Sequence, residues 1–189
     1  MEKLKRFIDC YISTETCNLR CHYCYIAQHN KFNNKLVKFE HRPEEIATAL
    51  SRERLGGVCL LNFCAGGETL LSPEVLPVVK ALLQEGHYVM IVTNGTVSKR
   101  FDELENIPSE LRKHLFFKFS FHYLELKRLG LLDKFRNNVE KAKSAGCSFT
   151  IEVTPSDELI PYIQEMKKCC QELFGAYCHV TIARNDVEY

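Results

Sequence analysis

The residues best suited to chemistry are three clustered cysteines, Cys17, Cys21 and Cys24, in the string Thr-Glu-Thr-Cys-Asn-Leu-Arg-Cys-His-Tyr-Cys-Tyr. Their C-x3-C-x2-C spacing differs from the paired C-x2-C motifs expected of a four-cysteine zinc site. Three thiolates on one loop can hold three irons of a four-iron cluster. The fourth iron then has no protein ligand, whereas fully ligated clusters mostly transfer electrons. A chelating amino acid, with one amine and one carboxylate, would fit the open iron.

Two other interpretations of the cluster stay open. One is a zinc site with His22 or His29 as the fourth ligand. The other is three unrelated buried cysteines, which three cysteines within eight residues of a polar loop argue against. The spacing favours iron–sulfur over zinc.

The other seven cysteines are scattered along mostly apolar runs, where small buried hydrophobic side chains are expected. A disulfide framework is a poor explanation for them in a reducing compartment, and the adjacent pair Cys169-Cys170 has no assigned role. They are Cys10, Cys59, Cys64, Cys147, Cys169, Cys170 and Cys178.

Composition predicts an ordinary soluble domain. The chain has 189 residues, with 46% hydrophobic and 26% charged, which suits one domain spanning 1–189. The formal net charge of +1 gives no indication of a nucleic-acid partner. No run reaches the roughly 18 apolar residues of a membrane span, and the N-terminus lacks the pattern of a signal peptide. We therefore expect a cytoplasmic protein.

Strand-like and helical patterns alternate along the chain, which predicts an α/β fold with a parallel sheet. The first connection, about 44 residues from Thr14 to Gly57, is the longest, and it contains the clustered cysteines. A sixth helix after the last strand is missing, so we expect a chain truncated after strand six, without its C-terminal helix or any extension. The predicted strands are 7–13, 58–64, 88–93, 116–121, 148–153 and 179–183, and the predicted helices are 43–54, 73–85, 131–145 and 157–173, with a broken one at 102–114.

The cysteine string, with Tyr23 before the third cysteine, resembles the motif of the radical SAM superfamily. The fuller string resembles the branch of anaerobic sulfatase-maturating and peptide-modifying enzymes. The resemblance spans roughly 7–183 and implies a partial (βα)6 TIM-like barrel. It also implies that Cys17, Cys21 and Cys24 bind a [4Fe–4S] cluster, whose open iron chelates S-adenosylmethionine.

Three later motifs occur in the family's order, each after a successive strand. Ala-Gly-Gly-Glu-Thr at 65–69 matches the motif that holds the methionine amine through Gly66, Gly67 and Glu68, with Thr69 in place of the usual proline. The Thr-Asn-Gly that contains Asn94 matches a motif near the cofactor, and Ser120 matches a serine that contacts its ribose or carboxylate. Tyr23 is expected near the adenine.

Several other polar residues follow the predicted strands or lie in charged segments. His122 follows Ser120 where many relatives in this branch have Asp-Gly, and it suits either a cavity wall or a hydrogen-bonded core position. Glu152 and Arg184 fit solvated positions better than cofactor contacts. The charged segments 31–38 and 141–143 are interpreted as solvated faces.

The resemblance implies an oxygen-sensitive radical SAM enzyme. A reduced cluster cleaves S-adenosylmethionine, and the resulting 5′-deoxyadenosyl radical abstracts hydrogen from a substrate. Flavodoxin or ferredoxin would serve as external one-electron donor. Relatives process peptides, nucleotides and sugars, so no single substrate is implied. The alternative is a non-catalytic iron–sulfur or zinc module that binds or senses.

Overall fold

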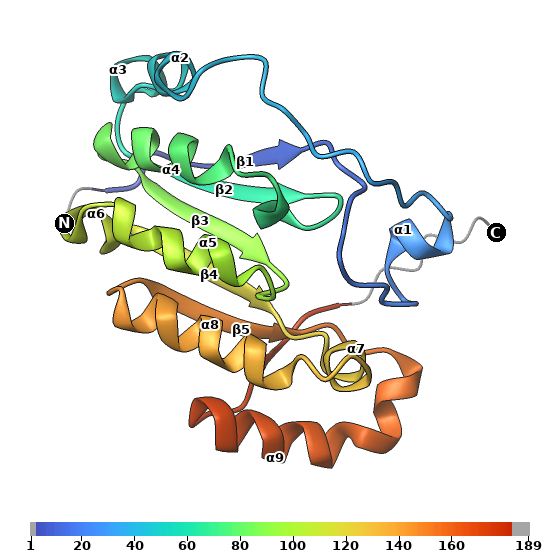
Figure 1. The fold of residues 1–189 in the computed structure, drawn as a ribbon. Coiled ribbons are helices and arrows are strands. Elements are labelled where there is room, and N and C mark those ends of the chain that lie inside the picture. Colours follow the sequence, from blue (N-terminus) through green and yellow to red (C-terminus); the bar gives the residue numbers. More distant parts are fainter. Residues whose placement is uncertain (1–2, 183–189) are drawn as a thin grey trace.

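The computed structural model describes residues 3–182, and these form one sheet of six parallel strands in the order β1-β2-β3-β4-β5-β6 (Figure 1). Every neighbouring pair is parallel, so every strand ends at the same edge of the sheet. The α/β fold and the partial (βα)6 arrangement are confirmed. The strands are β1 (Arg6–Ile12), β2 (Cys59–Ala65), β3 (Tyr88–Thr93), β4 (Leu115–Ser120), β5 (Ser148–Val153) and β6 (His179–Val180).

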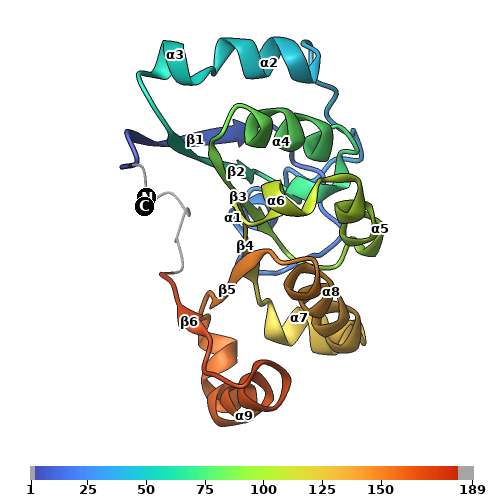
Figure 2. The same ribbon diagram turned by 90° about the vertical axis from the view of Figure 1, so that its left-hand side faces the viewer.

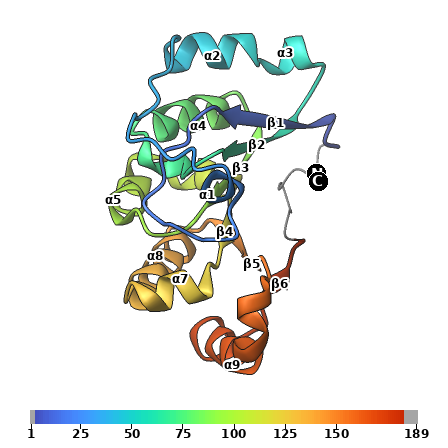
Figure 3. The same cartoon turned by 90° about the vertical axis from the view of Figure 1, so that its right-hand side faces the viewer.

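Most helices cover one face of the sheet, as Figures 2 and 3 show from opposite sides. The exception is α1, which follows the cysteines and lies at the carboxyl ends of the strands (Figures 1 and 3). The helices are α1 (Tyr25–Gln28), α2 (Pro43–Ala49), α3 (Arg52–Leu55), η1 (Thr69–Leu71), α4 (Val75–Gln84), α5 (Ser98–Asp102), η2 (Glu103–Asn106), α6 (Ser109–Arg112), α7 (Tyr123–Arg128), α8 (Leu132–Ser144), η3 (Asp157–Tyr162) and α9 (Ile163–Phe174).

The strands form where the sequence places β-branched and aromatic residues in alternation. In β3 and β4, alternate side chains are buried. One set packs under the helices, and the other faces the side of the sheet that these helices leave open. Within residues 3–182, none of the helices combines the length and the apolar character needed to cross a bilayer.

Two predicted helices are divided in the structure. The predicted helix at 43–54 separates into α2 and α3, because Ser51 adopts an extended conformation and its side chain caps α3. The predicted helix at 157–173 begins as the 3₁₀ helix η3 and continues as α9. Pro161, inside η3, has no amide hydrogen for an α-helical bond.

An aromatic cluster fills the space between β4 and the helices. Phe117, Phe119, Phe121 and Phe135 are fully buried, and the rings of Phe121 and Phe135 lie 5.1 Å apart. A side chain added at Gly95 would come within 2.8 Å of the Phe135 ring. The turn after β3 can therefore lie against α8 only because Gly95 has no side chain.

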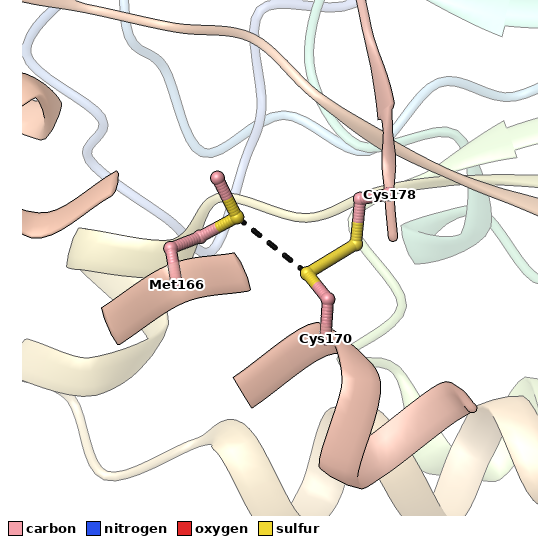
Figure 4. The surroundings of a disulfide bond; sticks show 3 residues. All are labelled: Met166, Cys170 and Cys178. Atoms are coloured by element: carbon pink, nitrogen blue, oxygen red, sulfur yellow. Dashed lines mark hydrogen bonds between the residues drawn. A yellow bond between two sulfur atoms is a disulfide. The ribbon is translucent and has the colours of Figure 1, made fainter. Parts of the chain in front are cut away.

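The scattered cysteines are not all independent hydrophobic residues. Cys170 on α9 forms a disulfide with Cys178, just before β6 (Figure 4). The thiol of Cys169 stays free. The bond joins Cys170 to a residue eight positions later, because the chain reverses direction at Gly175, where α9 ends, before it enters β6.

Replacing Phe135 with alanine should lower the free energy of unfolding by about 3–5 kcal/mol, because a fully buried ring leaves a cavity. The matched control is Phe149→Ala on β5, where the side chain is 36% exposed and the cost should be smaller. Denaturant titrations measure both free energies. Equal losses in the two variants would contradict this account of the core.

Candidate functional site

A cavity of about 470 Å³ opens at the carboxyl ends of the strands. Its walls come from the cysteine loop and from the segments that follow β2, β3 and β4. The structure brings all the predicted site residues together here. Those lining the cavity are Cys17, Cys21, Tyr23, Cys24, Gly66, Gly67, Glu68, Asn94 and Ser120.

The cysteine loop is held by side chains from the loop after β3 and from helix α7. Asn94 Nδ2 donates to Asn18 Oδ1 at 2.9 Å, and Asn18 Nδ2 donates to Thr96 Oγ1 at 2.7 Å. On its other side, the backbone amide of Arg20 donates to Glu125 Oε1 at 3.0 Å. The loop therefore depends on contacts more than 70 residues away in the sequence.

The glycine pair after β2 lies directly against the cysteine loop. The amide of Gly67 donates to the carbonyl of Thr14 at 2.6 Å, and the amide of Glu68 donates to the carbonyl of Thr16 at 2.9 Å. A side chain at Gly67 would collide with the Thr16 carbonyl, and one at Gly66 would collide with the Thr14 carbonyl. Glycine is needed here for close approach of two backbones.

The Glu68 carboxylate is buried and joins this turn to the end of β3. It accepts hydrogen bonds from the Thr93 hydroxyl at 2.6 Å, the Asn94 amide at 2.7 Å and the Leu70 amide at 2.9 Å. Burial raises its pKa, and the three hydrogen bonds act in the opposite direction. A carboxylate has about four acceptor positions, and these bonds occupy three of them.

The three thiols lie close enough to influence one another electrostatically. Burial raises the pKa of Cys17 to about 11 and that of Cys21 to about 12, and the charge on Cys24 raises both. Cys17 Sγ also accepts hydrogen bonds from the Leu19 amide at 3.4 Å and from Asn94 Nδ2 at 3.8 Å. Burial therefore disfavours the thiolate forms of Cys17 and Cys21, which a bound metal would stabilise.

The ligand set fits a cluster better than a single ion. Among residues 3–182, no three His, Cys, Asp or Glu side chains are grouped so that they could hold one metal ion. His22, a possible fourth zinc ligand, is paired with Glu158 at 2.7 Å. Each thiolate of a cluster binds a different iron, so the three sulfurs need not converge on one point.

Tyr23 and His122 join the cysteine loop to the end of β4. The Tyr23 hydroxyl and His122 Nδ1 share a hydrogen bond of 2.6 Å. Burial lowers the pKa of His122 to about 4, so the ring is neutral at pH 7. His122 is expected from the sequence either in the cavity wall or in a hydrogen-bonded core position. It combines both features, since it lines the cavity and is hydrogen-bonded to Tyr23.

The structure corrects the prediction for Glu152 and does not describe Arg184. Glu152 is not solvated: its side chain is 12% exposed and pairs with Lys118 at 2.8 Å. Arg184 lies outside the described residues. Sequence reasoning missed Glu125, since no motif marks a carboxylate that contacts the cysteine loop from α7.

Replacing Gly67 with alanine should lower the melting temperature by several degrees, because the new methyl group forces the two backbones apart. Gly146→Ala is the control: that position has φ +84° but nothing within 4 Å of the added atom, so only conformational strain is introduced. Thermal unfolding measures both variants. A smaller shift for Gly67→Ala than for Gly146→Ala would contradict the close packing of this turn.

Replacing His122 with glutamine should make stability less sensitive to acid. In the native chain, the pKa of His122 lies below its ordinary value of 6.5, so between pH 6.5 and 4 the unfolded state binds the extra proton. Stability is therefore lost as the pH falls through that range. Between pH 7.5 and 5.5, the native chain should lose on the order of 1 kcal/mol more than the variant. Denaturant titrations at both values test this, and identical losses would refute it.

Solved structures with the same fold include two that carry the cofactor named above. Native anSMEcpe with bound AdoMet has a TM-score of 0.69 and 17% identity, and the match covers 97% of this chain and 53% of that one. Streptococcus suis SuiB bound to S-adenosylmethionine has a TM-score of 0.64 and 14% identity, over 98% of this chain and 42% of that one. At these identities the likeness shows the fold.

Curated relatives are more similar in sequence. The GTP 3′,8-cyclase of Clostridium perfringens is 29% identical over 140 residues, which cover 68% of this chain and 40% of that protein. The 7-carboxy-7-deazaguanine synthase of Thermoplasma acidophilum is 30% identical over 90 residues, covering 48% and 39%. The chain thus spans about 40% of the length of these relatives. A sequence profile of the Radical SAM superfamily matches residues 11–155, and the chain therefore belongs to the radical SAM superfamily.

Proposed function

We propose that this chain is the core domain of a radical SAM enzyme, with residues 1–189 forming a single domain. Cys17, Cys21 and Cys24 hold a [4Fe–4S] cluster, and S-adenosylmethionine binds at the remaining iron. When bound and reduced, the cluster would supply the electron for reductive cleavage of S-adenosylmethionine, the source of a 5′-deoxyadenosyl radical that would abstract hydrogen from a substrate. The observation that carries the proposal is the single cavity lined by three cysteines and by every predicted cofactor contact.

The chain's own residues would bind and orient the cofactor. Gly66 and Gly67 leave room beside the cysteine loop, and the Glu68 carboxylate would accept a hydrogen bond from the methionine amine. Tyr23 is fixed by His122 and would pack near the adenine. Ser120, at the end of β4, would contact the ribose or the carboxylate.

Asn94 connects two parts of this arrangement. Its backbone amide donates to Glu68, and its side chain donates to Asn18 and to Cys17 Sγ. Hydrogen bonds to a ligating sulfur influence the reduction potential of an iron–sulfur cluster. Asn94 would therefore position the amine acceptor and tune one cluster ligand at the same time.

Such a cluster needs electrons from outside the chain, so the proposal includes an external one-electron donor such as flavodoxin or ferredoxin. Proximity of the bound cofactor to its reductant replaces a bimolecular encounter with a fixed geometry. The cavity walls, which include the buried side chains of Leu19 and Ile26, limit the access of water to reactive species.

Anaerobic reconstitution should load about four irons per chain, and dithionite with S-adenosylmethionine should then yield 5′-deoxyadenosine, measured by chromatography. Cys21→Ala should lower the iron content and reduce product formation at least a hundredfold, because a ligand is lost. Cys147→Ala is the matched control, since Cys147 is equally buried but lies outside the cavity.

Equal product formation by the Cys21→Ala variant and the native chain would dismiss the cluster assignment. If the anaerobically purified chain holds zinc and forms no product, the alternative of a non-catalytic metal-binding module is correct instead. Iron without product would identify a non-catalytic iron–sulfur protein.

A further inference from the structure

A positively charged segment crosses the outside of the cysteine loop. Residues 14–42 contain five arginines and lysines against two glutamates, a net charge of +3. The whole chain has a net charge of +1, which leaves −2 for all the other residues. Residues 14–42 are therefore more positively charged than the chain as a whole.

Three of these cations have no acidic partner. Lys31, Lys35 and Lys38, called the lysine segment below, are exposed, and within residues 3–182 none of them forms an ion pair. Elsewhere, lysines such as Lys118, Lys127 and Lys141 are paired with carboxylates. The unpaired charges of the lysine segment are free to attract an anionic partner.

Hydrogen bonds place this segment directly beside Cys17. The Thr16 hydroxyl lies 2.6 Å from the carbonyl oxygen of Lys35, and the Asn33 side chain donates to Glu15 Oε2 at 3.1 Å. On the other side of Cys17, the guanidinium of Arg20 lies 4.1 Å from the centre of the Phe32 ring. Figure 1 shows the same chain running from α1, at the carboxyl ends of the strands, back to α2.

An apolar side chain lies among the cations. Leu36, between Lys35 and Lys38, is 52% exposed. An apolar side chain among charged ones suits a transient interface. The charges accelerate the encounter of the two proteins, and the small apolar area adds limited affinity. Electron-transfer complexes are at the small end of the range of protein interfaces.

We propose that the lysine segment with Leu36 is the docking surface for a small acidic electron-transfer protein. The inference rests on the proposed function, since it needs a cluster on Cys17, Cys21 and Cys24. The donor is oxidised by one electron and the cluster is reduced by one electron, with no bond made or broken. The hydrogen bond from the Thr16 hydroxyl to the Lys35 carbonyl places this surface next to the residue that precedes Cys17, so a docked donor would lie close to the cluster. The segment interpreted from sequence as a solvated face thus has a partner.

The test compares two reductants on the reconstituted full chain. Stopped-flow spectroscopy follows the bleaching of the cluster by dithionite, which needs no docking site, and by a reduced acidic flavodoxin. In the variant Lys31→Glu, Lys35→Glu, Lys38→Glu, the rate with flavodoxin should fall at least about tenfold at low salt, because attraction becomes repulsion. The rate with dithionite should stay within about twofold of the native rate, which separates this inference from the cluster assignment.

The control variant Lys5→Glu, Lys113→Glu, Lys143→Glu changes the net charge equally. These exposed lysines lie near the amino ends of β1, β4 and β5, away from the cysteines. At 0.15 M salt, where the Debye length is about 8 Å, the control should keep most of its rate with flavodoxin. A second variant with glutamine at the three positions of the lysine segment should show an intermediate loss, and circular dichroism checks that all variants fold.

Equal rates with flavodoxin for the native chain and the lysine-segment variant, with normal reduction by dithionite, would overturn the docking surface and leave the proposed function intact. If the lysine-segment variant loses binding to a single-stranded RNA but keeps its rate with flavodoxin, the docking surface is overturned in favour of a nucleic-acid site. A chain that takes up no iron would overturn both proposals.

Discussion

The backbones of Thr14 and Thr16 lie so close to Gly66 and Gly67 that no side chain fits between them. Two short amide–carbonyl hydrogen bonds hold the two segments in this position. The cysteine loop contains little regular structure of its own, so its shape depends on this contact. The close approach determines where the three thiols lie relative to the rest of the cavity.

The parallel sheet explains why the contact forms where it does. All six strands end at one edge, so the loops that follow them meet there, although they are far apart in the sequence. Glu68 uses this proximity: it lies after β2, and it accepts hydrogen bonds from residues at the end of β3. The cost of burying its carboxylate is offset by these bonds.

Charged side chains are paired at some places in the fold and unpaired in the lysine segment. Inside the sheet, Glu152 and Lys118 neutralise each other, and beside the cysteine loop Glu125 is paired with Arg128. The three unpaired lysines of the lysine segment lie exposed beside that loop. A protein whose total charge is close to zero can therefore still present a strongly positive surface at one place.

The sequence by itself determined the strand–helix alternation, the bounds of β3 and β5, and nine of the residues that line the cavity. These depend on local patterns, namely residue periodicity and short motifs, which can be read without knowing distances. Only the tertiary structure decided that Glu125 contacts the cysteine loop, that Tyr23 bonds to His122, and that Cys170 pairs with Cys178. Each of these contacts joins side chains brought together by packing in three dimensions. No local pattern encodes such contacts, because they result from how whole elements lie against one another.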